Sequence, residues 1–158
     1  MKYTFLLVFL FVFSIQIQAQ KVAIFDSYSD LEKTVLSDEK TTYVVNFWAT
    51  WCPPCVEELP LFEKLNSENK NLKVVLVSLD FKNQYESKLL PFLEKNKIAS
   101  EVVLLTDKDY NSWLSMVDKD WSGSIPATLV ITKNKRKFVE KMFSNYEELN
   151  QYINSIIN

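Results

Sequence analysis

The two cysteines of this chain are the residues whose type and spacing can do chemistry. Cys52 and Cys55 are its only cysteines, and two prolines separate them. They follow a β-branched and aromatic run, residues 42–48, and begin an amphipathic stretch, residues 56–65. A helix N-terminus carries unpaired N–H groups and a partial positive charge, which favour thiolate over thiol. The pair therefore predicts a redox-active disulfide at the junction of a strand and a helix.

Other uses of a Cys-x-x-Cys pair fit the composition less well. A structural zinc site needs four ligands, but the chain has no histidine and no third cysteine. A purely structural disulfide would close a very short loop and would constrain the unfolded chain only weakly. Two soft thiolates can also hold copper(I), although no methionine or histidine stands beside the motif to help them. A copper(I)-binding chaperone therefore stays as an alternative to redox exchange.

The N-terminus has the pattern of a targeting segment. Lys2 precedes the apolar run 5–13, and a polar stretch containing Ala19 follows. This pattern is typical of a secretory signal peptide, because the apolar run is too short to span a bilayer comfortably. We expect a signal peptide over residues 1–19 and one domain of ordinary size over residues 20–158, exported to the periplasm. An uncleaved N-terminal membrane anchor is the alternative.

The composition excludes several classes of binding partner. The formal net charge of −2 gives no electrostatic reason to expect nucleic acid or an anionic membrane surface as a partner. Gly123 is the sole glycine, so the chain has no Gly-rich loop of the kind that cradles phosphate. We expect a monomer that binds no nucleic acid and needs no cofactor besides its own disulfide.

Hydrophobic periodicity places the elements that must position the cysteines. The predicted strands cover residues 43–48, 73–79, 101–105, 127–132 and 137–142. The predicted helices cover residues 29–36, a segment after Cys52 that contains Pro60, and residues 84–95, 110–117 and 144–157. Capping-box spacings at Ser29 and Ser144 are expected to start the first and last helices. The order is β-α-β, then further α and β elements, then β-β-α.

Two motifs in this frame resemble a known family. Residues 45–60 are similar to exported TlpA/ResA-type thiol–disulfide oxidoreductases, with the run Val-Asn-Phe-Trp-Ala-Thr-Trp-Cys-Pro-Pro-Cys-Val-Glu-Glu-Leu-Pro. Residues 123–128 form the second motif, Gly-Ser-Ile-Pro-Ala-Thr. The resemblance covers residues 21–157. It implies an α/β thioredoxin fold, with a central mixed β-sheet flanked by helices and an extra strand–helix insert within residues 81–120.

The resemblance also assigns a substrate site. In that family the proline that corresponds to Pro126 is cis and lies against the disulfide. The residue before it can then offer its backbone N–H and C=O to an extended substrate strand. We therefore expect Ile125 and Pro126 to bind substrate, together with Trp51 and Pro53 beside the cysteines. An ordinary trans proline at a strand entrance is the alternative for Pro126.

One departure from classical thioredoxin concerns the acid–base group. Thioredoxins carry a buried aspartate beneath the disulfide, where this chain has Asn46, whose amide cannot exchange a proton. Glu58 lies three residues after Cys55, so helical spacing returns it to the same face. ResA-like proteins have a functional glutamate at this position, and Glu58 is the candidate here. A solvated helix carboxylate is the alternative.

These observations predict a cycle of thiol–disulfide exchange. Cys52, nearest the helix N-terminus, is expected to attack, and Cys55, one turn further in, to resolve the mixed disulfide. The expected function is a disulfide reductase for exported disulfide-containing proteins, re-reduced by a membrane electron donor. A disulfide-forming oxidant on the same fold is the alternative, although strong oxidants usually carry a histidine between the cysteines.

Two further classes are disfavoured. A peroxiredoxin needs a threonine where this chain has Ala49 and an arginine near the thiolate, while Arg136 is its only arginine. A redox-silent binding domain would use a surface of Trp48, Trp51 and Trp121 for peptide contact, which leaves the intact cysteines unexplained. Of these aromatic residues only Trp51 is assigned to the site.

Overall fold

The computed structural model describes residues 22–157, so the predicted signal segment 1–19 lies outside the described residues. The strands are β1 (Ala23–Phe25), β2 (Thr42–Trp48), β3 (Leu72–Ser78), β4 (Glu101–Leu105), β5 (Ala127–Ile131) and β6 (Arg136–Val139). The α-helices are α1 (Tyr28–Val35), α2 (Pro53–Glu68), α3 (Leu90–Lys95), α4 (Tyr110–Val117) and α5 (Tyr146–Ile157). A 3₁₀ turn, η1 (Lys82–Gln84), and a π-helical turn, η2 (Tyr85–Leu89), lead into α3.

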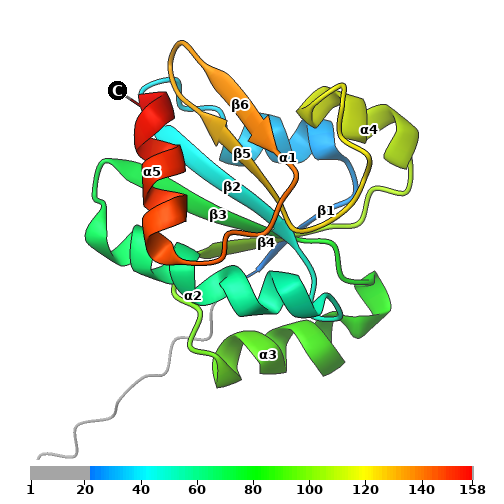
Figure 1. The fold of residues 1–158 in the computed structure, drawn as a ribbon. Coiled ribbons are helices and arrows are strands. Elements are labelled where there is room, and N and C mark those ends of the chain that lie inside the picture. Colours follow the sequence, from blue (N-terminus) through cyan, green and yellow to red (C-terminus); the bar gives the residue numbers. More distant parts are fainter. Residues whose placement is uncertain (1–21, 158) are drawn as a thin grey trace, which may run out of the picture.

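The strands form one mixed sheet in the order β1-β4-β3-β2-β5-β6 (Figure 1). The first four strands in that order run parallel, and β5 and β6 are antiparallel to their neighbours. The central strand β2 pairs with β3 along its whole length and with β5 on its other side. The predicted central mixed sheet flanked by helices is confirmed.

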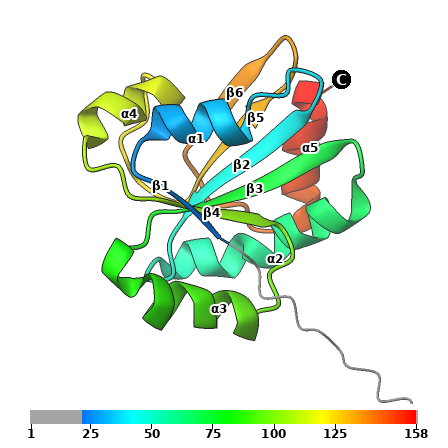
Figure 2. The ribbon, with the colours of Figure 1, turned by 180° about the vertical axis from the view of Figure 1, so that it is seen from behind.

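Helices cover both faces of the sheet, as the front and back views show (Figures 1 and 2). Alternate residues of a strand point to opposite faces, so each central strand contributes to two cores. In β2, Val44 and Trp48 pack with the buried faces of α2, α3 and α5. Val45 and Phe47 pack with the buried residues of α1 and α4. Asn46 is therefore a buried polar residue on the α2 side.

The capping predictions were wrong by one or two residues. Helix α1 begins at Tyr28, because the hydroxyl of Ser27 accepts a hydrogen bond from the Asp30 N–H at 3.4 Å. At α5 the cap is Asn145, whose side chain accepts from the Glu148 N–H at 3.0 Å. In both places a neighbouring polar side chain has the geometry that the predicted serine lacks.

The insert is more divided than predicted. One helix was expected over residues 84–95, but η1, η2 and α3 succeed one another there. Pro91 lies in the first turn of α3, where its missing N–H leaves no helical bond unmade. Strand β4 then enters the sheet between β3 and β1, and the three-residue strand β1 itself was not predicted.

The topology brings several loops to one edge of the sheet. The parallel strands β1, β2, β3 and β4 all end there, and β5 starts there because it runs antiparallel to β2. Ligand sites in open α/β sheets characteristically lie outside the carboxyl ends of the strands. Within residues 22–157, no helix is long and apolar enough to cross a membrane.

Candidate active site

Cys52 and Cys55 form a disulfide at the first turn of α2. Cys52 is the N-cap residue, and its N–H donates to the Ala49 carbonyl at 3.1 Å. Cys52 is 5% exposed, whereas Cys55 is fully buried. Cys52 is therefore the residue of the pair that an incoming group can reach.

The helix that carries the disulfide begins with two consecutive prolines, Pro53 and Pro54. Proline is compatible with the first helical turn, where N–H groups have no intrahelical acceptor. Proline also has no N–H, so two donors that point outward at other helix N-termini are missing here. The thiolate of Cys52 therefore faces fewer hydrogen-bond donors than a thiolate at a proline-free helix start.

The segment before β5 lies directly against the disulfide. The Sγ of Cys52 lies 3.8 Å from the carbonyl oxygen of Ile125. The Ile125–Pro126 peptide bond is cis. Ile125 is half-buried and Pro126 is buried, and the carbonyl of Ile125 lies beside the reactive sulfur.

The loop before Ile125 is held by a carboxylate. Glu140 accepts from the N–H groups of Ser122 and Ser124 at 3.1 and 3.0 Å, and also from the Ser122 hydroxyl. The indole N–H of Trp121 donates to the Ser124 carbonyl at 2.9 Å. Between the serines, Gly123 has φ of +92°, a region that residues with a Cβ rarely occupy. Sequence reasoning did not identify Glu140, which lies beyond β6.

Glu58 lies on the buried side of α2, three residues after Cys55, and is fully buried. Its Oε1 accepts from Asn46 Nδ2 at 2.8 Å, and its Oε2 accepts from the Phe143 N–H at 2.9 Å. Burial raises the pKa of Glu58 to about 7, although the bonds from Phe143 and Asn46 act in the opposite direction. The alternative of a solvated helix carboxylate is wrong.

Asn46 links Glu58 to β5. Its Nδ2 also lies 3.4 Å from Thr128 Oγ1, while its own Oδ1 has no hydrogen-bond partner among the described residues. A side-chain amide can turn over and exchange its donor and acceptor positions. Asn46 can thus face either protonation state of Glu58, by donating to the carboxylate or by accepting from the carboxylic acid. The contribution of Phe143 was not predicted, because its N–H comes from a loop far along the chain.

A second buried carboxylate anchors the loop in front of the cysteines. Asp80 follows β3 and is buried. It accepts from the Thr50 N–H at 3.1 Å, from the Thr50 hydroxyl at 2.5 Å and from the Ser78 hydroxyl at 2.8 Å. Thr50 is two residues before Cys52, so this contact fixes the approach of the chain to α2.

The tryptophans differ in exposure, as expected for a site that uses only Trp51. Trp48 and Trp121 are buried in the two cores, whereas Trp51 is exposed and stacks on Phe81 with ring centroids 6.5 Å apart. A tryptophan surface for a redox-silent binding domain is therefore not present. Pro53 is exposed on the same helix start as the disulfide.

Arg136, the only arginine, lies away from the sulfurs. Its guanidinium donates to Glu32 at 2.8 Å and to the Tyr28 hydroxyl at 3.1 Å, both on α1. Position 49, where a peroxiredoxin needs threonine, is a buried alanine. The arrangement lacks the two groups that the peroxidase alternative requires.

A Cys-x-x-Cys disulfide at a helix start, set against a loop before an antiparallel strand, defines a thioredoxin-like thiol–disulfide oxidoreductase. Residues 17–139 match the AhpC/TSA family, and the chain belongs to that family. The thioredoxin-like protein YneN of Bacillus subtilis is 33% identical over 120 residues, which are 70% of this chain and 69% of that protein.

One further relative agrees on the family, and one solved structure agrees on the fold alone. The thiol–disulfide oxidoreductase ResA of Bacillus cereus is 30% identical over 133 residues, 81% of this chain and 72% of that protein. A secreted disulfide oxidoreductase of Mycobacterium tuberculosis has a similar fold, with a TM-score of 0.58, 20% identity, and coverage of 76% of this chain and 85% of that one. The resemblance to ResA-type proteins is confirmed.

Proposed function

We propose that this protein is a disulfide reductase for exported proteins. Thiol–disulfide oxidoreductases act on disulfide-containing substrates, and the class is established here by family membership and by the Cys52–Cys55 pair. The observation that carries the proposal is the position of Cys52: its sulfur is the less buried one and lies beside the backbone of Ile125. A substrate strand paired with that backbone would bring its own sulfur to Cys52.

The exchange proceeds in two balanced steps. The thiolate of Cys52 attacks one sulfur of the substrate disulfide, a mixed disulfide forms, and the other substrate sulfur leaves as a thiolate. Cys55 then loses its proton and attacks the Cys52 sulfur, which releases the second substrate thiol. Two electrons pass from the protein to the substrate, and the protein is left with the Cys52–Cys55 disulfide.

Glu58 is the group proposed to take the proton of Cys55. Its pKa of about 7 lies close to the operating pH expected for a general base. Each carboxylate oxygen accepts one N–H, which leaves each a lone pair for a proton. Cys55 and Glu58 both lie on the buried side of α2, three residues apart, which is a spacing at which helical side chains are neighbours.

The surroundings of the reactive thiolate support the proposed direction of electron flow. An oxidant of this type is strong when its reduced form is stabilised. Here no histidine separates the cysteines, and Pro53 and Pro54 supply no N–H. A poorly stabilised thiolate gives up electrons readily, which favours a reductase.

A reductase that works outside the cytoplasm needs a source of electrons, because extracytoplasmic compartments are oxidising. The apolar N-terminal segment supports export, and we propose a membrane dithiol carrier that reduces the Cys52–Cys55 disulfide after each turnover. The protein would act as a monomer, in the periplasm or held to the membrane by its N-terminus. Ile125 and Pro126, with Trp51 and Pro53, would bind the substrate.

Trapping tests the proposal. The Cys55→Ser variant retains the attacking sulfur and lacks the resolving one, so it should accumulate a mixed disulfide with insulin through Cys52 that mass spectrometry detects. Wild-type protein should reduce insulin when dithiothreitol is present, and Cys52→Ala should not. Stoichiometric copper(I) binding without insulin reduction would instead favour the chaperone.

A further inference from the structure

The most exposed large apolar side chains lie at the carboxyl edge of the sheet, which is also the edge that carries the disulfide. Among the described residues, the three most exposed are Phe81 at 56%, Tyr110 at 53% and Trp51 at 52%. Trp51 stacks on Phe81, and the ring of Tyr110 lies 6.1 Å from that of the buried Trp113. These residues lie in loops or at an element start at the carboxyl edge of the sheet. A soluble monomer leaves such a group exposed when it serves for contact.

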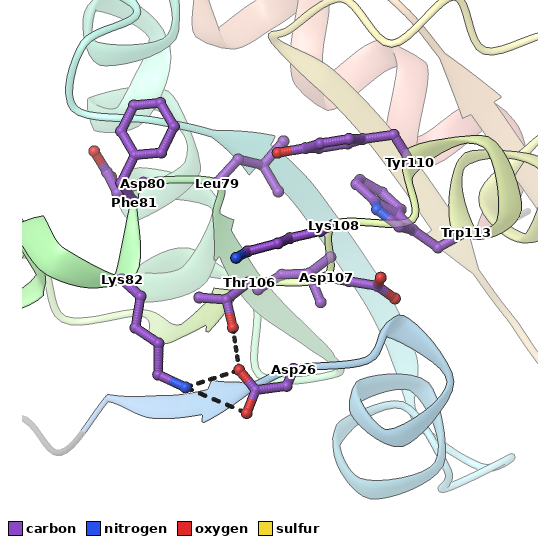
Figure 3. A pocket seen from close by; sticks show the side chains of 11 residues that line it. Asp26, Leu79, Asp80, Phe81, Lys82, Thr106, Asp107, Lys108, Tyr110 and Trp113 are labelled. Carbon is purple, nitrogen blue, oxygen red and sulfur yellow. Dashed lines mark hydrogen bonds and ion pairs between the residues drawn. The ribbon is translucent and has the colours of Figure 1, made fainter.

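A hollow separates Phe81 from Tyr110 (Figure 3). Its volume of about 240 Å³ exceeds the roughly 150 Å³ that holds a benzene ring in an engineered cavity. Its apolar lining comes from Leu79, Leu105 and Trp113, below the two exposed rings. The hollow is open to solvent and has space for one large side chain.

The carboxylates around the hollow are already engaged. Asp26 binds Lys82 at 2.9 Å and the Thr106 hydroxyl at 2.5 Å (Figure 3). Asp107 accepts from the N–H groups of Tyr28 and Asp109, both at 3.0 Å. Asp80 is turned to Thr50 and Ser78, as described above. Lys82 balances the charge of Asp26, whereas the neutral donors around Asp80 and Asp107 occupy their oxygens without cancelling their charges.

Lys108 is the lysine of the hollow that is not held by a direct contact. Among the described residues it makes no hydrogen bond and no ion pair, although it is near enough to Asp26 to lower the pKa of that carboxyl weakly. Its side chain extends across the hollow, with Tyr110 above it and Thr106 below it in Figure 3. An ammonium group between aromatic and aliphatic walls fits a ligand that joins an apolar side chain to a carboxylate.

We propose that this hollow binds the part of a substrate polypeptide next to its reacting half-cystine, and that it selects a large apolar side chain with an acidic neighbour. The inference rests on the proposed function, since it names the substrate class of that same site. Continuity with the disulfide decides the occupant: Trp51 stands directly before Cys52 and stacks on the wall of the hollow. A second copy of this chain or its own N-terminal segment are rival occupants.

Synthetic peptides provide the test. Each peptide carries one cysteine as a mixed disulfide with 2-mercaptoethanol, which is neutral and small. Two parent peptides carry Phe two residues and Asp three residues from the cysteine, one on its N-terminal side and the other on its C-terminal side. Matched peptides replace Asp by Lys, Phe by Ala, or both residues by Ala. The reduced full-length protein attacks the peptide disulfide, releases peptide thiol and mercaptoethanol, and ends as the Cys52–Cys55 disulfide. Stopped-flow tryptophan fluorescence gives each second-order rate constant.

We expect wild-type protein to react fastest with one of the Phe–Asp peptides. The preference for Phe over Ala should be roughly threefold to tenfold, the range of an aromatic contact. The preference for Asp over Lys should be roughly threefold, as for an exposed ion pair. Phe81→Ser and Tyr110→Ser should remove the first preference, and Lys108→Glu should reverse the second.

Matched controls lie outside the hollow. Met116→Ser removes another exposed apolar side chain, and Lys133→Glu makes the same charge change in the β5–β6 turn at the other end of the sheet. Both controls should retain the wild-type preferences. Because each preference is a ratio within one variant, altered overall reactivity does not affect it.

Three results would overturn the inference. Equal rates for all peptides, with normal reduction of the small hydroxyethyl disulfide, would show that the hollow does not select the substrate. The proposed function would be unaffected. Dimers in the wild type that Phe81→Ser dissociates would assign the hollow to a second copy. Faster, unselective reaction after removal of residues 1–21 would assign it to the N-terminal segment. No reduction of any disulfide, small or peptide, would contradict the proposed function itself.

Discussion

Glu58 has an environment that the sequence alone leaves undecided. Spacing from Cys55 places it on one helix face, and that face can be solvated or buried. The structure buries it and supplies two N–H donors, from Asn46 and Phe143. Phe143 could not be predicted, because it contributes a backbone group and lies far from Glu58 along the chain. The redox chemistry can be predicted from the two cysteines in the sequence, whereas the proton acceptor can be identified only from the packing around Glu58.

The pH dependence of exchange should change in Glu58→Gln. A glutamine cannot accept the proton of Cys55, so resolution of the mixed disulfide should slow by roughly 10²-fold, the lower range for general base catalysis. The inflection of the pH–rate profile near pH 7 should also disappear. Single-turnover release of thiol from the mixed disulfide, followed from pH 5 to pH 9, measures both effects.

Glu57→Gln is the matched control, because Glu57 is the exposed neighbour on the same helix. This variant should keep the wild-type profile. A Glu58→Gln profile that coincides with that of the wild type would reject the proton-transfer role.

Stability should also depend on Glu58. Its folded-state pKa of about 7 is above the ordinary value of 4.5, so the folded protein holds this proton more tightly than the unfolded chain does. The resulting stabilisation is complete below pH 4.5 and is lost as the pH rises through 7. Between pH 5 and pH 8 this group should lower the free energy of unfolding by about 2–3 kcal/mol.

Urea unfolding of wild type and Glu58→Gln across that range isolates the contribution. The glutamine side chain can accept from Phe143 and donate to Asn46, whose amide turns over so that its unpartnered Oδ1 accepts. The difference between the two proteins should therefore grow in favour of the variant above pH 7. A constant difference at all pH values would mean that Glu58 titrates normally.

The loop between β2 and α2 depends on a contact from β3. Asp80→Ala leaves the Thr50 N–H and hydroxyl and the Ser78 hydroxyl without their acceptor, which should lower the free energy of unfolding by about 2–3 kcal/mol. It should also slow exchange at Cys52, since the loop that places this residue is released. Urea unfolding and iodoacetamide labelling of the reduced protein measure the two effects.

Asp38→Ala is a suitable control, because Asp38 makes similar bonds to the Lys40 N–H and the Thr41 hydroxyl, but in an exposed turn. It should cost less than about 1 kcal/mol and leave labelling unchanged. Equal effects of the two substitutions would show that the buried anchor has no special part in placing the cysteines.

The elements that sequence predicts well are those with a clear pattern of apolar residues. Strand β4 and helix α4 have the predicted bounds, and β2 and β3 differ by one residue, because unbroken β-branched runs and clear helical spacing leave few alternatives. Strand β1 has three residues and little burial, so its pattern is weak. The division of residues 82–95 follows from packing and from Pro91, which periodicity does not resolve.

The balance between oxidised and reduced protein reports the direction of electron flow. If Cys52 and Cys55 belong to a reductase, the fold should tolerate the disulfide better than the two thiols. The oxidised protein should then have the larger free energy of unfolding, and each 1.4 kcal/mol of that difference corresponds to about 30 mV. Urea unfolding of the oxidised protein and of the protein in excess dithiothreitol gives the difference directly.

Cys52→Ala/Cys55→Ala protein, unfolded with and without dithiothreitol, controls for the reductant itself. A reduced form more stable than the oxidised one would identify an oxidant, as in the alternative for this fold. The sheet should be unaffected in either state, because both cysteines belong to one turn of one helix.

Gly123 has a consequence for how this sequence can vary. The chain uses its one glycine in the loop that leads to Ile125, where φ is +92° and an added Cβ would lie 3.3 Å from Leu114 Cδ1. Every other turn of the described residues is built without glycine, and Lys97 is the one other position with positive φ. In a library of all single substitutions, position 123 should therefore tolerate few changes although it is exposed, whereas neighbouring exposed loops should accept most residues. Intolerance at an exposed loop position would mark the exchange site without any assay of the cysteines.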